Sequence, residues 1–188
     1  MRVRRGDRAG DHAAVTASEW FPGEGRTADD EAFLTELRRL VARSGLADVR
    51  PEGTGTTVHA WGWLVAWARV PGLEAGDADP QLQVGFARSD GLVPPLVATW
   101  ETHGFLLDNW DELVAAGGAG TPVAMAGQAF DWLSRQVRRP VELATWNRRR
   151  RKAVRMWRLA DTGELITGDS AGFRLAERRP QDLVARLR

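Results

Sequence analysis

Residues 141–159, VELATWNRRRRKAVRMWRL, decide how the fold of this chain is interpreted. Apolar and polar side chains alternate in Val141–Trp146 and again in Ala153–Leu159, and a run of arginines lies between the two segments. Alternation with a period of two is typical of β-strands, and two such segments separated by a short polar run predict an antiparallel hairpin. We therefore expect Arg148–Arg151 to form the loop of a β-hairpin.

The pairing register of this hairpin predicts which side chains share a face. With Arg148–Arg151 as the loop, antiparallel pairing gives a mostly apolar face, which we expect to be core, made of Val141, Leu143, Thr145, Val154 and Met156. The opposite face then consists of Glu142, Trp146, Arg155 and Trp157. We expect this second face to present two accessible indoles beside a basic loop.

The rest of the chain predicts a mixed α+β fold. Helical spacing of apolar residues with capping signals predicts two helices, at 27–45 and 121–138. Between them we expect an antiparallel three-stranded meander, 56–70, 81–88 and 92–99, followed by a short helix at 109–116. After the hairpin we expect strands at 164–167 and near Phe173, and a short C-terminal helix from Pro180. The order is helix, meander, helix, second antiparallel hairpin or meander, and short C-terminal helix, without the alternation that parallel sheets require.

The domain organisation follows from where periodicity begins. Residues 1–26 mix charge, glycine and proline without periodicity, which predicts a mobile N-terminal arm with Trp20 and Phe21 as its anchor. Residues 27–188 predict a single α+β domain. Alternatively, the glycine-rich segment 117–121 divides this domain into two lobes.

Composition excludes several classes of protein. The chain has no cysteine, which excludes disulfides, thiolate metal sites and thiol nucleophiles. It also has no uninterrupted apolar run of about 18 residues, so we expect no membrane span. Only one of the 26 basic residues is a lysine, and glycine and alanine are abundant, as in proteins from GC-rich bacterial genomes. We therefore expect a cytoplasmic bacterial protein.

Charge is unevenly distributed although the net charge is only +1. Between Gly72 and Glu112 there are eight acidic residues and one basic residue, and between Arg135 and Arg158 ten basic residues and one acidic residue. Such asymmetry bears on binding partners rather than on fold. It predicts an acidic end and a basic end.

The hairpin supplies the candidate binding residues, Trp146, Arg148, Arg149, Arg150, Arg151, Lys152, Arg155 and Trp157. Indoles beside arginines combine a stacking surface with a positive field, which suits single-stranded or structured nucleic acid. The same residue types are enriched at protein interfaces, where aromatic and arginine side chains anchor partners. A solvated basic loop with both indoles packed inside the fold is the third interpretation.

A second row of indoles lies in the first predicted strand, where alternation places Trp61, Trp63 and Trp67 on one face. Three exposed tryptophans would form an apolar patch that monomers avoid, so the row is either internal or an interface. The burial of large apolar residues in most proteins favours the internal interpretation.

Catalysis has one candidate cluster, consisting of Glu101, His103, Asp108, Asp111 and Glu112. A histidine with several carboxylates could supply acid-base groups or ligands for a hard metal ion, but the spacing matches no known catalytic motif. We predict no cofactor and no metal. The sequence thus favours a non-catalytic intracellular binding or accessory protein that recognises a protein or peptide. Nucleic-acid binding through the hairpin is the alternative and an enzyme built on the acidic cluster is a second one, and the oligomeric state stays open.

Overall fold

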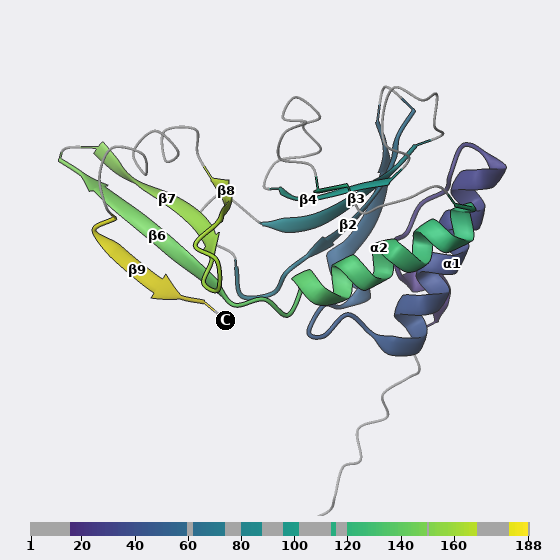
Figure 1. Cartoon of the computed structure of the whole chain (residues 1–188), viewed down its shortest axis with the longest axis horizontal. Coiled ribbons are helices and arrows are strands. Elements are labelled where there is room, and N and C mark those ends of the chain that lie inside the picture. Colours follow the sequence, from purple (N-terminus) through teal and green to yellow (C-terminus); the bar gives the residue numbers. More distant parts are fainter. Residues whose placement is uncertain are drawn as a thin grey trace, which may run out of the picture.

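The computed structural model of the chain describes residues 16–59, 62–73, 80–87, 96–101, 114–115, 120–149, 151–168 and 181–187. Within these ranges two α-helices and two antiparallel sheets form an α+β fold, as the sequence predicts (Figure 1). The first sheet has five strands in the order β1-β2-β3-β4-β5, and the second has four in the order β8-β7-β6-β9.

The elements have the following bounds. The first half contains α1 (Ala28–Ser44), β1 (Thr54–Val58), β2 (Leu64–Arg69), β3 (Gln81–Phe86), β4 (Leu96–Glu101) and β5 (Val114–Ala115). The second half contains α2 (Pro122–Gln136), β6 (Val141–Arg148), β7 (Arg151–Leu159), β8 (Leu165–Gly168) and β9 (Leu183–Arg186). Short 3-10 turns lie at Ala17–Glu19 and Pro51–Gly53.

Both predicted helices are present, and their caps explain their limits. Thr27 accepts a hydrogen bond from the backbone N–H of Asp30, whose carboxylate accepts one in return from the N–H of Thr27. This reciprocal cap satisfies backbone donors at the first turn of α1. Gly45, with φ of +71°, ends α1, and Thr121 caps α2 through the N–H of Ala124.

The two helices pack against each other and cover one face of the first sheet (Figure 1). The buried side chains of α1 are Asp30, Phe33, Leu34, Leu37 and Val41. Those of α2 are Met125, Ala126, Ala129, Trp132 and Leu133. On the same helix, Phe130 is only partly buried against this core. None of the helices in the described ranges is long and apolar enough to cross a membrane.

The predicted long strand 56–70 is wrong in one respect, because it is two strands. β1 and β2 form an antiparallel hairpin in which Val58 lies opposite Leu64. The chain reverses where Gly62 takes a φ of +84°, a conformation that favours glycine. Alternation survives within β2, where Leu64, Ala66 and Ala68 join the core under the helices.

The opposite face of the first sheet carries the indole row in part. Trp63 is 4% exposed and packs in a small cluster with Val65, Ala87 and Val97. Trp67 is half-buried, and its ring lies over Gly55, where an added Cβ would be 2.3 Å from the ring. Trp61 is outside the described residues. The internal interpretation is therefore correct for Trp63, whereas Trp67 is only half-buried.

Residues 21–23 close the outer edge of the first sheet along β1. Pro22 accepts hydrogen bonds from the N–H and the hydroxyl of Thr56, and the N–H of Phe21 donates to the Thr54 hydroxyl at 2.8 Å. Arg38 of α1 donates to the carbonyls of residues 20, 21 and 23. Trp20 and Phe21 are buried. This part of the predicted mobile arm, 1–26, is thus packed, whereas residues 1–15 lie outside the described ranges.

Strand pairing, once in each sheet, corrects two predicted helices. Residues 183–186, assigned from the sequence to a short C-terminal helix, form β9, which pairs with β6. Val114 and Ala115, within the predicted helix 109–116, pair with β4. Propensity favoured helix in both segments, and pairing with a neighbouring strand overrides it. Pro180 and Phe173 lie outside the described residues.

One continuous apolar core joins the two sheets. Val141, Trp157 and Leu159 of the second sheet belong to the same buried cluster as the helices and the first sheet, on both sides of residues 117–121. The indole N–H of Trp157 donates to the carbonyl of Leu73 at 2.9 Å. On the surface, Arg139 after α2 holds Asp161 in the turn between β7 and β8 with two hydrogen bonds. The second sheet is therefore fixed to the first at one end.

Candidate binding site

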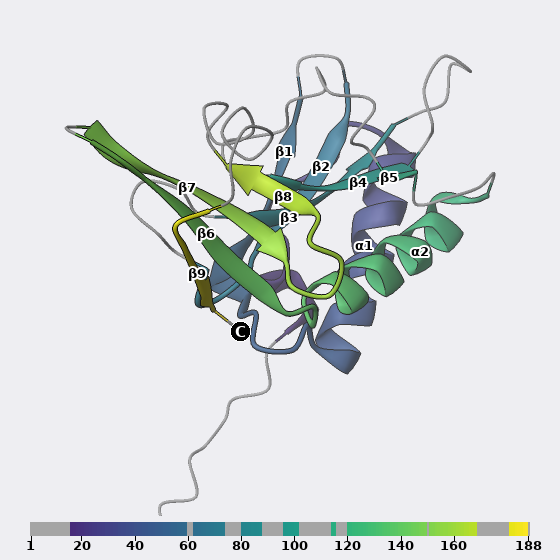
Figure 2. The same ribbon diagram turned by 60° about the vertical axis from the view of Figure 1, so that its left-hand side comes forward.

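The β6–β7 hairpin extends beyond both of its neighbouring strands (Figure 2). Pairing with β9 reaches Thr145 of β6, and pairing with β8 reaches Met156 of β7. Residues 146–155 therefore form a two-stranded ribbon that no other described strand accompanies. We call these residues the basic arm.

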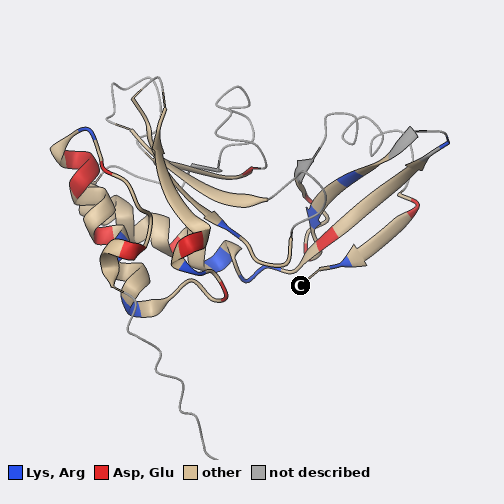
Figure 3. Ribbon diagram, turned by 180° about the vertical axis from the view of Figure 1, so that it is seen from behind, with Lys and Arg blue, Asp and Glu red and all other residues tan. Residues whose placement is uncertain are grey.

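The basic arm carries a dense positive charge. Its sequence contains five consecutive cations, Arg148 to Lys152, and then Arg155, with no acidic residue. The side chains of Arg149 and Arg155 are exposed, and Arg150 lies outside the described residues. Figure 3 shows the basic tip at one end of the molecule and the acidic residues of α1 at the other end. Because neighbouring like charges repel one another, an anionic partner would relieve this repulsion.

The predicted accessibility of Trp146 and Trp157 is wrong. Trp146 is 2% exposed and Trp157 is 1% exposed, and the two indoles lie on opposite faces of the sheet. The predicted loop Arg148–Arg151 is too long, because Arg148 ends β6 opposite Arg151 at the start of β7. The register then shifts at a bulge so that Trp146 lies opposite Val154. A shift of one residue turns every later side chain of one strand to the other face. Neither Trp146 nor Trp157 therefore presents an exposed indole beside the arginines of the basic arm.

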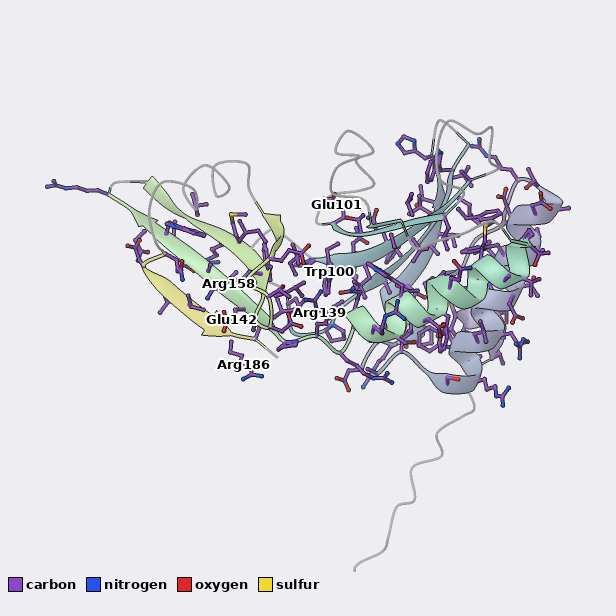
Figure 4. The ribbon with its side chains drawn as sticks, in the orientation of Figure 1. Trp100, Glu101, Arg139, Glu142, Arg158 and Arg186 are labelled. Carbon is purple, nitrogen blue, oxygen red and sulfur yellow. The ribbon has the colours of Figure 1, made fainter. Side chains whose placement is uncertain are left out.

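The two indoles instead anchor the root of the arm from both sides. Trp157 enters the main core, whereas Trp146 packs with Ala144, Val154 and Met156 on the other face. Next to this cluster, Glu142 accepts hydrogen bonds from Arg158 at 2.9 and 2.8 Å (Figure 4). The root of the arm is therefore held by buried side chains on both faces of the sheet.

A brace that the sequence did not predict holds β6 where β9 begins. The backbone N–H of Asn147 donates to the carboxylate of Asp182 at 2.6 Å, and the N–H of Asp182 donates to the carbonyl of Thr145 at 2.9 Å. Charge-assisted bonds of this kind are stronger than neutral ones. An acidic residue directly before the alternating segment Leu183–Arg186 is the signal that could have found it.

One edge of the arm offers backbone hydrogen-bonding groups. In β7 the N–H of Leu159 donates to Glu164 on the β8 side, and the N–H of Ala160 donates to Pro140 on the β6 side. Antiparallel alternation then directs the N–H and C=O groups of Arg155 toward the β8 side, whereas Ala153 lies in the bulge, where alternation is interrupted. Within the described ranges, no strand lies beside Arg155. A polypeptide strand could pair there.

The predicted acidic cluster lies almost entirely outside the described residues. Only Glu101 is described, and it ends β4 in a half-buried position (Figure 4). Among the residues that the structure describes, no group of three or more His, Asp or Glu side chains could hold a metal ion. Thr121, at the end of the glycine-rich segment, serves as the cap of α2.

Comparison with known proteins adds no further indication of function. Neither the protein-family models, nor the curated proteins, nor the solved structures contain a match to this chain.

Proposed function

We propose that the chain is a non-catalytic binding protein that recognises an acidic segment of a protein or peptide through the basic arm. The observation that carries the proposal is the projection of residues 146–155 beyond both neighbouring strands, with six cations and no carboxylate. Arginine suits this role because its planar guanidinium forms paired hydrogen bonds with carboxylates.

Two features favour a polypeptide partner over nucleic acid. Binding of single-stranded nucleic acid usually relies on aromatic side chains on which bases stack, and Trp146 and Trp157 are buried. The outward-facing backbone groups of Arg155 could pair with an extended peptide, as in proteins that bind peptides by adding a strand to a sheet edge. Acidic side chains along such a strand would lie beside the arginines.

The proposal can be tested by selecting peptides from a random library with the purified protein as bait. We expect enrichment of acidic, β-prone sequences. Replacing Arg148–Arg151 together with Gln should weaken binding of a selected peptide by about 10- to 100-fold, because each exposed ion pair contributes roughly 0.2–1 kcal/mol. A control variant replaces four exposed arginines elsewhere, Arg26, Arg43, Arg50 and Arg138, with Gln. It changes the net charge equally and should bind as the wild type does.

The alternatives give different results in matched assays. If labelled single-stranded or duplex DNA or RNA bound through Arg148–Arg151, and no acidic peptide was enriched, the partner would be nucleic acid. Affinity should then fall steeply as salt is added, because phosphate contacts release counterions. If selected peptides bound the two four-arginine variants equally well, the basic arm would not be the recognition element.

A further inference from the structure

The outer edge of β9 is the second surface at which this fold offers backbone groups to a partner. β9 is the last strand of its sheet and pairs with β6. The N–H of Leu187 donates to the carbonyl of Val141, so the odd-numbered residues of β9 direct their backbone groups toward β6. The N–H and C=O of Val184 therefore point away from the sheet.

The sequence of this edge lacks several of the devices that protect edge strands from pairing, although β9 is short and contains Arg186. Leu183, Val184 and Ala185 are consecutive uncharged residues, and Leu183 is 58% exposed. Natural edge strands are commonly protected by lysine, proline, a bulge or a covering segment. Within β9 there is no lysine or proline, and its pairing with β6 is regular across all four residues. An edge of this kind is suited to pairing with another strand.

The charges at the ends of the segment fit a second copy of the same strand. Asp182 and Arg186 lie two residues before and two residues after Val184. In an antiparallel pair centred on Val184, the register sets Asp182 of each copy across from Arg186 of the other, so opposite charges come near each other at both ends of the pair. Asp182 directly precedes β9, and its N–H and carboxylate bind β6. A carboxylate has two oxygens that accept about four hydrogen bonds, so Asp182 can keep its bond to Asn147 in this arrangement.

We propose that β9 pairs with β9 of a second copy across a two-fold axis at Val184. The two Val184 residues exchange a pair of backbone hydrogen bonds, because their N–H and C=O groups face each other in this register. The exposed side chain of Leu183 lies opposite Ala185 of the second copy, which covers apolar surface. The result is a continuous sheet of eight strands, four from each copy.

The geometry of this dimer has a consequence for the basic arms. β6 is antiparallel to β9, and the two β9 strands are antiparallel to each other. The two β6 strands are therefore antiparallel as well, and the two arms point in opposite directions. The dimer does not depend on the proposed function of the arm, but it would present two arms at opposite ends of one sheet.

Disulfide cross-linking tests both the contact and its register, because the natural chain contains no cysteine. Cα atoms of a hydrogen-bonded antiparallel pair lie about 5.5 Å apart, a distance that a disulfide spans. Val184→Cys should give a cross-linked dimer under mild oxidation of the full chain. Val123→Cys is the matched control, because Val123 is 49% exposed at the start of α2, a helix that is not part of the second sheet. It should cross-link only slowly, through random collisions.

Sedimentation equilibrium of uncross-linked variants supplies a second measurement. Val184→Pro removes the outward N–H without affecting the bonds to β6, and should weaken the dimer at least about tenfold. Val184→Thr keeps the N–H and should dimerise as the wild type does. Leu183→Lys, at an exposed position, should also weaken the dimer, whereas Val123→Lys should not.

Several results would overturn the proposal. One is a wild-type chain that stays monomeric up to about 1 mM, where even a weak edge-to-edge dimer forms. Another is a dimer that Val184→Pro and Leu183→Lys leave unchanged, since the contact would then lie elsewhere. Equal cross-linking of Val184→Cys and Val123→Cys would exclude the proposed register. If Val184→Pro failed to fold, Leu183→Lys and the cross-linking comparison would still decide the question.

Discussion

The two sheets treat their outer edges in opposite ways. The first sheet is sealed along β1, where residues 20–25 run beside the strand and Arg38 of α1 binds three of their carbonyls. The second sheet leaves β9 at its margin and sends residues 146–155 beyond its other strands. Exposed strand edges invite pairing with other chains, so proteins generally close those that have no partner.

The edge of the first sheet at β1 therefore has a structural role, whereas the edges of the second sheet are the proposed interaction surfaces. Two contacts close the fold along β1. Gly23 lies close to Thr56, and Arg38 donates hydrogen bonds to three backbone carbonyls. The second sheet shares one core with the first only at the end that carries Trp157. Its far end carries the charge and the available backbone groups. The two proposed interaction surfaces accordingly both lie on the second sheet.

The largest expected effect tests whether the two sheets form one cooperative unit. Trp157→Ala removes a buried indole from the shared core together with its hydrogen bond to Leu73, and should destabilise the protein by about 3–5 kcal/mol. Trp157→Phe keeps most of the ring and should cost less. Urea unfolding should show a single transition in each variant. Two separate transitions in Trp157→Ala would mean that the second sheet unfolds independently.

The next effect tests the seal along β1. Gly23 has φ of +123°, and an added Cβ would lie 2.0 Å from the Thr56 hydroxyl oxygen. Gly23→Ala should therefore cost about 1–3 kcal/mol and loosen residues 20–25 from β1. Gly45→Ala is the control, because Gly45 also has a positive φ but open space around its Cα. Chemical denaturation should rank Gly23→Ala as the more destabilising change. Equal losses would show that close approach to Thr56 does not matter.

The same contrast explains which features could be predicted from the sequence. Helices α1 and α2 are correctly predicted because capping residues and helical spacing are local signals, as at Thr27 and Thr121. The α+β class and the β6–β7 hairpin follow from alternation. The sealing of β1 could not be predicted in detail, because Arg38 meets residues 20–23 only after the chain has folded.

The candidate site was predicted only in part, because the bulge in the β6–β7 hairpin changes the pairing register. The positive charge of Arg148–Lys152 is a property of the sequence and does not depend on register. The exposure of Trp146 and Trp157 depends on register, and the bulge between residues 146 and 148 changes it by one residue. The β9 strand was missed because four residues are too few for alternation to outweigh helix propensity.

The smallest expected effect compares an ion pair that joins the end of α2 to the β7–β8 turn with one that lies inside a single helix. Arg139 donates two hydrogen bonds to Asp161, and these bonds lower the pKa of Asp161 below its ordinary value of 3.8. Glu36 on α1 also has a lowered pKa, because Arg39 three residues later donates hydrogen bonds to it. Both pairs lie near the surface, where solvent screens them and their contribution is small.

The sign of the pH dependence follows from the direction of these pKa shifts. A carboxyl group whose pKa is lower in the folded chain stabilises the fold above its unfolded pKa, and this contribution is lost as pH falls through the folded pKa. Asp161→Asn should lower Tm at pH 7 by at most about 2–4 °C, and the difference from wild type should shrink toward pH 3. Glu36→Gln should change Tm in the same direction.

Asp161 also fixes the β7–β8 turn to the end of α2. Asp161→Asn should therefore increase amide hydrogen exchange in this turn and at the end of α2, whereas Glu36→Gln should increase it in α1 alone. Equal exchange patterns in the two variants would mean that the Arg139–Asp161 pair does not help to hold the second sheet in place.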